Sequence, residues 1–184
     1  MPGSAGFIDA SRVIAPLQVP SATTDRGAGD VHPYGNPHYL TDPLAGLQVA
    51  YLLRDRFSEL DPVHAADFEA RARDFERELL TALAGADAVA RFEAQVLISA
   101  IEAGRTEDLL GGPPGGWLGE LAPHRGAPVV QDHRIFDYFA ARFGLRTVIE
   151  LEPLAHQVGA LEGAQDYLTT VALNVERVRE ALAP

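Results

Sequence analysis

The chain has 184 residues, 47% of them hydrophobic, and a formal net charge of −11, which predicts one well-buried globular domain and excludes a disordered chain. The acidic balance argues against a nucleic-acid or anionic-membrane surface, because both need a positive footprint. The sequence holds no cysteine, so any metal site must be built from His, Asp, Glu and water.

Targeting signals are absent from the sequence as printed. No stretch approaches the roughly 20 apolar residues that a membrane-spanning helix needs. The N-terminal residues MPGSAGFIDASRV lack the basic and apolar regions of a signal peptide. On these residues alone we expect a cytoplasmic chain.

The first two segments differ in composition. Residues 1–42 are rich in Gly, Pro, Ser and Asp and predict a loop-rich lead-in, whereas residues 43–127 predict a helical segment. Asp42-Pro43 and Asp61-Pro62 each place an N-cap acceptor before a proline at the first helical position. We therefore expect one helix to begin at each of these two sites.

Apolar residues recur at helical spacing in both expected helices. The first stripe comprises Leu44, Leu47, Tyr51, Leu53, Phe57 and Leu60. The second helix, from Pro62 to about Ala84, presents Phe68, Ala72, Phe75, Leu79 and Leu83. The opposite face of this second helix carries residues of both charges, which indicates that it is exposed to solvent.

Glycines separate the elements that follow. A third helix is expected from about Ala86 to Ala103, ending at Gly104. The segment GGPPGGW, residues 111–117, predicts a loop between helices. It is not a phosphate-binding loop, because no strand precedes it and no Lys-Ser/Thr follows it.

Residues 128–184 predict an α/β segment. PVVQD reads as a short buried strand from Pro128, His133–Phe143 as a helix, and residues 145–151 as a second strand. This order implies a parallel pair with a right-handed crossover. A last helix is expected from about Ala164 to Leu182. The fold class is therefore α/β and helix-rich, with a short parallel sheet and flanking helices.

The carboxyl ends of parallel strands are where such sheets bind ligands. Asp132 and His133 follow the first expected strand, and His156 follows the second. His38 lies in a loop braced by Pro37. From position alone His133 can be a ligand, a helix-cap residue or a surface group, and position does not favour the ligand role. If the histidines converge, imidazoles with a carboxylate or water suit zinc.

Three segments resemble one known family. They are GDVHPYGNPHYLTDP (29–43), GAPVVQDHRIFDYFAARFGLRTVIELEP (126–153) and LAHQVGALEGAQDYL (154–168). The resemblance is to the metal-specific periplasmic solute-binding proteins of ABC importers, the zinc and manganese receptors. It implies a fold like the C-terminal part of a two-lobed receptor, in a chain that looks shorter than a member.

The resemblance also implies a ligand set. His38 in NPHYLTDP matches the family's HxWxDP-like ligand segment, and His133 matches a second ligand position where histidine favours zinc over manganese. LAHQVG resembles the neighbourhood of the last carboxylate ligand, where this chain has His156. The implied metal ligands are His38, His133 and His156, with His32, Asp132 and Asp166 as outer-shell or alternative ligands.

The function implied is binding of zinc, or alternatively manganese, for an ABC permease in the cell envelope. We expect no enzyme and no catalytic residues, and we expect a shortened member to form a homodimer. Two alternatives stay open: a protein–protein scaffold that has lost metal binding, and a zinc-dependent hydrolase. The hydrolase needs a general base beside the metal-bound water, and no residue in the sequence identifies one.

Overall fold

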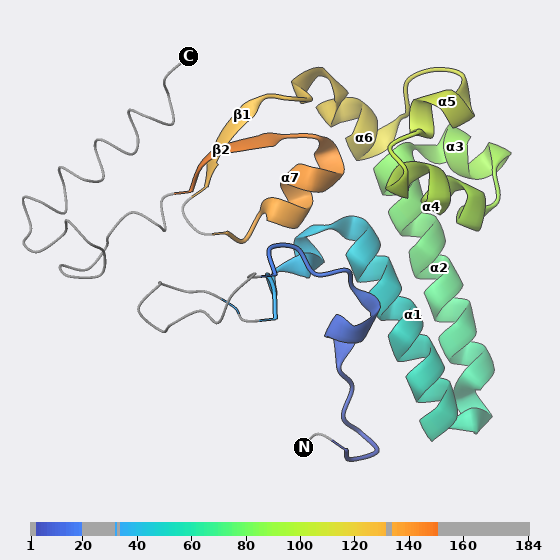
Figure 1. Ribbon diagram of the computed structural model, residues 1–184. Helices are drawn as coiled ribbons and strands as arrows, with labels where there is room; N and C mark the ends of the chain where they lie inside the picture. The colour runs from blue at the N-terminus through green and yellow to red at the C-terminus, as the bar shows by residue number, and fades with distance from the viewer. Residues whose placement is uncertain (1–2, 20–31, 33, 132–133, 151–184) are drawn as a thin grey trace, which may run out of the picture. The chain divides into compact units, whose positions relative to one another are not determined.

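The computed structural model describes residues 3–19, 32, 34–131 and 134–150 (Figure 1). The chain divides into two compact units. The first comprises Met1–Ala15 and Asp42–Arg125, and the second comprises Pro16–Thr41 and Gly126–Pro184. The first unit is helical, and the second contains a two-stranded parallel sheet, so the predicted helix-rich α/β class is confirmed. The helix expected near residues 164–182 lies outside the described residues.

Two helices, α1 (Pro43–Leu60) and α2 (Ala65–Ala84), lie side by side as a hairpin in the first unit (Figure 1). Asp42 caps α1 as predicted, because its Oδ1 accepts a hydrogen bond from the Leu44 N–H at 3.0 Å. Asp61 makes no such cap, and its carboxylate instead contacts His64 Nδ1 at 2.7 Å. Residues Pro62–His64 form a 3-10 turn, so α2 begins three residues later than Pro62, where the sequence placed it.

The core of this unit collects at one end of the hairpin. Its largest fully buried side chains are Leu44, Leu47, Leu80, Leu83 and Leu97. The predicted stripe on α2 is partly wrong, because Phe75 is 42% exposed while Leu80 is buried. Apart from Ala72, the buried residues of α2 are Leu80, Leu83 and Ala84 in its last turns, at the end of the helix where Figure 1 shows α3, α4 and α6.

The single helix expected over 86–103 is two helices, α3 (Ala86–Arg91) and α4 (Ala94–Glu102). Phe92 between them is extended, with φ −130° and ψ 143°. Ala88 and Leu97 are both buried, yet in one straight helix nine residues at about 100° each would put them on opposite faces. The break at Phe92 therefore lets both sides of this segment reach the core.

The glycine-rich loop connects α5 (Thr106–Leu110) with α6 (Gly116–Leu121). The Gly115 N–H donates to the Ala84 carbonyl at 3.0 Å. A Cβ on Gly116, whose φ is +55°, would lie 2.9 Å from the Ala82 carbonyl carbon. The loop was predicted over 111–117, but Gly116 and Trp117 belong to α6. The glycines allow α6 to approach the last turn of α2 at backbone distance.

In the second unit, β1 (Pro128–Gln131) pairs in parallel with β2 (Arg146–Glu150), in a register that sets Pro128 opposite Arg146. The helix α7 (Asp137–Phe143) connects them, which confirms the strand–helix–strand prediction. β1 is not a buried strand as expected, because Val130 is 53% exposed. Successive side chains of a strand point to opposite faces of the sheet, so the side chains on an uncovered face of β1 reach solvent.

α7 begins at Asp137 and not at His133 as predicted. Residues 134–136 form turns instead. The Phe136 N–H donates to Gln131 Oε1 at 3.2 Å, a side-chain contact that replaces a first helical turn. Phe136, the residue before α7, is 50% exposed. Within the described part of the chain, no helix combines the length and the apolar character that crossing a membrane requires.

Candidate metal site

The loop that carries His38 is folded tightly before it reaches the histidine. The Asn36 N–H donates to the Leu17 carbonyl at 2.9 Å, and the Gly35 N–H donates to the His32 carbonyl at 3.1 Å. Gly35 has φ +96°, and a Cβ there would lie 2.8 Å from both the Leu17 carbonyl oxygen and Pro16 Cβ. Only glycine fits this position without strain, so the local chain path depends on it.

Two of the six histidines come together in this loop. The rings of His32 and His38 lie edge to face, with centroids 6.0 Å apart and an interplanar angle of 76°. Two imidazoles on one tetrahedral zinc, at Zn–N distances of about 2.0–2.1 Å, have centroids roughly 5 Å apart, which is about 1 Å closer than the rings of His32 and His38. The spacing of the two rings is therefore compatible with a shared ion after a small movement.

Asn36 uses both ends of its side-chain amide. Its Oδ1 accepts from the His38 N–H at 2.9 Å. Its Nδ2 donates to the Arg134 carbonyl at 2.5 Å and to Asp137 Oδ2 at 3.2 Å. Asn36 is only 6% exposed, so these bonds are shielded from water. The amide thereby connects the His38 loop to the turn between β1 and α7.

Asp137 lies at the centre of this buried polar network. The residue is 9% exposed, and its carboxylate accepts from Gln18 Nε2 and Gln131 Nε2 as well as from Asn36 Nδ2. It also stands in the first turn of α7, where the helix dipole favours a negative charge. Neutral amides and the helix terminus together satisfy the buried carboxylate.

Tyr138 adds a second connection between the same segments. Its hydroxyl donates to the Asn36 carbonyl at 2.9 Å and accepts from the Leu17 N–H at 2.9 Å. Its ring contacts Tyr39 edge to face, with centroids 6.5 Å apart. The hydroxyl of Tyr138 therefore connects Leu17 and Asn36 to α7 within the second unit.

Sequence reasoning missed Asn36, Gln131 and Asp137 as parts of the site's surroundings. A signal was present for Gln131, since it is a polar residue that ends the otherwise apolar strand PVVQ. Asp137 in the segment RIFDYF carried no comparable signal, because an acidic residue near a helix start is most simply read as a surface group.

The predicted ligands divide into two groups. His32 and His38 are described and lie close together, whereas Asp132, His133, His156 and Asp166 lie outside the described residues. Among the residues that the structure describes, no three His, Asp or Glu side chains gather so as to hold a metal ion. His64 and His124 are exposed and belong to the first unit.

The first unit also has a cavity of about 560 Å³ beside α4 and α5. Its lining includes one carboxylate, Asp108, and no histidine; the other lining residues are Gln95, Val96, Ser99, Ala100, Arg105 and Leu109. This donor set does not suit zinc, which prefers several imidazole or carboxylate ligands.

Comparison with known proteins identifies one family. The family model described as zinc-uptake complex component A periplasmic (ZnuA) matches residues 3–95, which is half of the chain. The matched range includes the loop with His32 and His38 and the helices α1 and α2. No curated protein and no solved structure matches the chain.

Proposed function

Because the chain belongs to the family of periplasmic zinc-uptake component A proteins, a family of solute-binding proteins for metal uptake, we propose that it binds Zn²⁺ for import through an ABC permease. The observation that carries the proposal is that the matched range contains the NPHYLTDP segment with His38. In this role the chain acts in the periplasm, captures the ion and delivers it to the permease. It performs no chemical conversion.

The proposed ligands combine described and sequence-derived positions. His38 is the first, and the nearby ring of His32 is an alternative partner. His133 and His156 are proposed from their places in the sequence, with Asp132 and Asp166 as further oxygen donors. A set dominated by imidazole supports zinc over manganese, since manganese prefers oxygen ligands. The net charge of −11 also favours a cation as the solute.

Zinc binding to the purified metal-free chain, measured by competition with a chromogenic chelator, tests the proposal. The site variant is His38→Ala/His133→Ala. Its matched control is His64→Ala/His124→Ala, which removes the same number of imidazoles from exposed positions of the first unit. We expect one ion per chain for the wild type and the control, and loss of that ion in the site variant.

Two results would contradict the proposal. The first is a wild-type chain that does not compete with the chelator, and the second is equal binding by the site variant and its control. A parallel titration with Mn²⁺ decides the choice of metal. Tighter binding of Mn²⁺ than of Zn²⁺ would replace zinc by manganese as the solute.

A further inference from the structure

We infer that Asn36 and Thr41 are positioning residues of the metal site, which hold the backbone of His38 against the turn that follows β1. The inference rests on the proposed function, because it concerns the same ion. Neither side chain is a proposed ligand, and both determine how well His38 binds the ion.

Asn36 holds His38 by the backbone N–H. The 2.9 Å bond from that N–H to Asn36 Oδ1 orients the peptide on the N-terminal side of the histidine. The other end of the amide donates to the Arg134 carbonyl and to the Asp137 carboxylate. Asparagine suits both tasks, because its amide accepts at one end and donates at the other. An aspartate at position 36 would accept but not donate.

Thr41 holds His38 by the backbone carbonyl. Its Oγ1 lies 2.9 Å from the His38 carbonyl oxygen and 3.2 Å from the Ile135 carbonyl oxygen, so its single proton is shared between them. The Thr41 N–H donates to the same His38 carbonyl at 3.2 Å. His38 is thus held on both sides of its Cα, and each side is connected to the Arg134–Ile135 backbone.

This arrangement bears on the affinity for the ion in two ways. A ligand whose backbone is already fixed loses less conformational freedom when the metal binds. Arg134 also directly follows His133, the proposed second ligand, in the sequence, so the same bonds act on the chain next to both ligands. Removal of outer-shell partners typically lowers metal affinity about 10- to 100-fold.

The test compares isosteric and conservative variants of the full chain. Thr41→Val keeps the shape and removes the hydroxyl, Thr41→Ser restores it, and Asn36→Ala removes the amide. Phe143→Ala is the control, because Phe143 is a buried residue of α7 that packs on Phe139 and its side chain has no polar atom that could hold the histidine loop. Each variant is measured for thermal unfolding without metal, zinc affinity by chelator competition, and the visible spectrum of bound Co²⁺.

We expect Thr41→Val and Asn36→Ala to weaken zinc binding about tenfold or more and to alter the Co²⁺ spectrum. Thr41→Ser should return both readouts towards the wild type. Phe143→Ala should unfold at a lower temperature and keep its zinc affinity and its Co²⁺ spectrum. Should Asn36→Ala fail to fold, the two Thr41 variants decide the result by themselves.

Three outcomes would overturn the inference. The first is that Thr41→Val and Asn36→Ala both bind zinc with the affinity of the wild type and give the same Co²⁺ spectrum. This result rejects the inference and leaves the proposed function standing. The second is that Phe143→Ala also loses zinc affinity, in proportion to its lower unfolding temperature. Asn36 and Thr41 would then act only by stabilising the fold. A wild-type chain that binds no zinc removes the proposed function, and this inference with it.

Discussion

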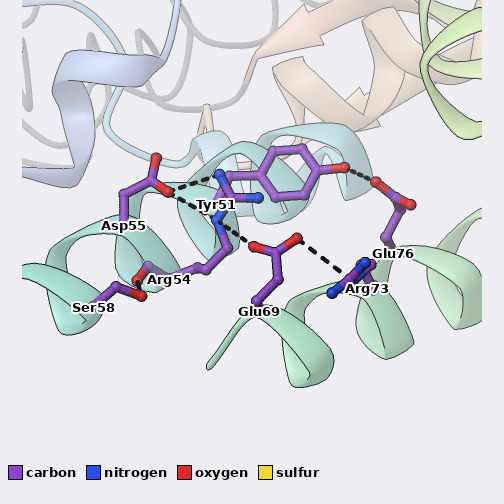
Figure 2. Close-up of polar contacts among 7 residues, drawn as sticks. All are labelled: Tyr51, Arg54, Asp55, Ser58, Glu69, Arg73 and Glu76. Atoms are coloured by element: carbon purple, nitrogen blue, oxygen red, sulfur yellow. Dashed lines mark hydrogen bonds and ion pairs between the residues drawn. The ribbon is translucent and has the colours of Figure 1, made fainter. Parts of the chain in front are cut away.

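The phenolic hydroxyl of Tyr51 on α1 donates a hydrogen bond to the carboxylate of Glu76 on α2 (Figure 2). Arg54 approaches the ring of Tyr51 to 5.1 Å from its centroid and forms an ion pair with Glu69 of α2 at 3.4 Å. Burial raises the pKa of Tyr51 above its ordinary value of 10.0, and the hydrogen bond and charge of Glu76 raise it further. The two helices are therefore joined by a polar contact that requires a protonated tyrosine.

This contact predicts a loss of stability at high pH. The folded chain keeps the Tyr51 proton at a pH where the unfolded chain releases it, so the free energy of unfolding is unaffected below pH 10 and falls as the pH rises above it. Tyr51→Phe should cost about 1 kcal/mol at neutral pH and lose less stability above pH 10 than the wild type. Urea unfolding of both proteins across this pH range measures their free energies of unfolding. Parallel pH profiles for the two proteins would contradict the prediction.

Gly116→Ala should destabilise the chain far more than Gly111→Ala. Both glycines have positive φ, but a Cβ on Gly111 meets nothing within 4 Å, whereas one on Gly116 meets the backbone of Ala82. We expect about 1 kcal/mol for Gly111→Ala from backbone strain alone, and about 3 kcal/mol for Gly116→Ala, where strain and overpacking add. Thermal and urea unfolding give the two values, and equal losses would show that α6 moves away without cost.

The two aspartates that precede prolines should differ in their effect on stability. Asp42 accepts from the Leu44 N–H, so Asp42→Ala should cost about 1 kcal/mol as a lost helix cap. Asp61 makes only an exposed contact with His64, and Asp61→Ala should cost less than about 0.5 kcal/mol. Urea unfolding of both variants measures the two losses of stability. A larger loss for Asp61→Ala than for Asp42→Ala would refute the assignment of Asp42 as the helix cap.

His32→Ala should weaken zinc binding about tenfold or more, because the His32 ring lies beside that of His38 and either binds the ion or orients its neighbour. His124→Ala removes an exposed imidazole of the other unit and should leave the affinity unchanged. Chelator competition measures both. Unchanged affinity in His32→Ala would exclude His32 from the site and its immediate surroundings.

Local signals in the sequence predicted local structure well. The start of α1 at Asp42-Pro43 and the end of α7 at Gly144 follow from cap chemistry that acts within one turn. The strand–helix–strand order of the second unit was equally readable. Burial was harder to predict: Phe75 has the spacing of a core residue and is nevertheless exposed. Periodicity identifies an apolar face and does not say what packs against it.

The candidate site shows the same division. The sequence by itself determined that any metal site would be built from His, Asp and Glu, because it holds no cysteine, and the segment NPHYLTDP led us to propose His38 as a ligand. Only the tertiary structure decided that His32 lies beside His38 and that Asn36 bonds to Asp137, a residue 101 positions away in the chain. The reason is physical. A hydrogen bond between segments far apart in the sequence depends on how the folded chain packs them together, and no local pattern of residues shows which distant segments will meet.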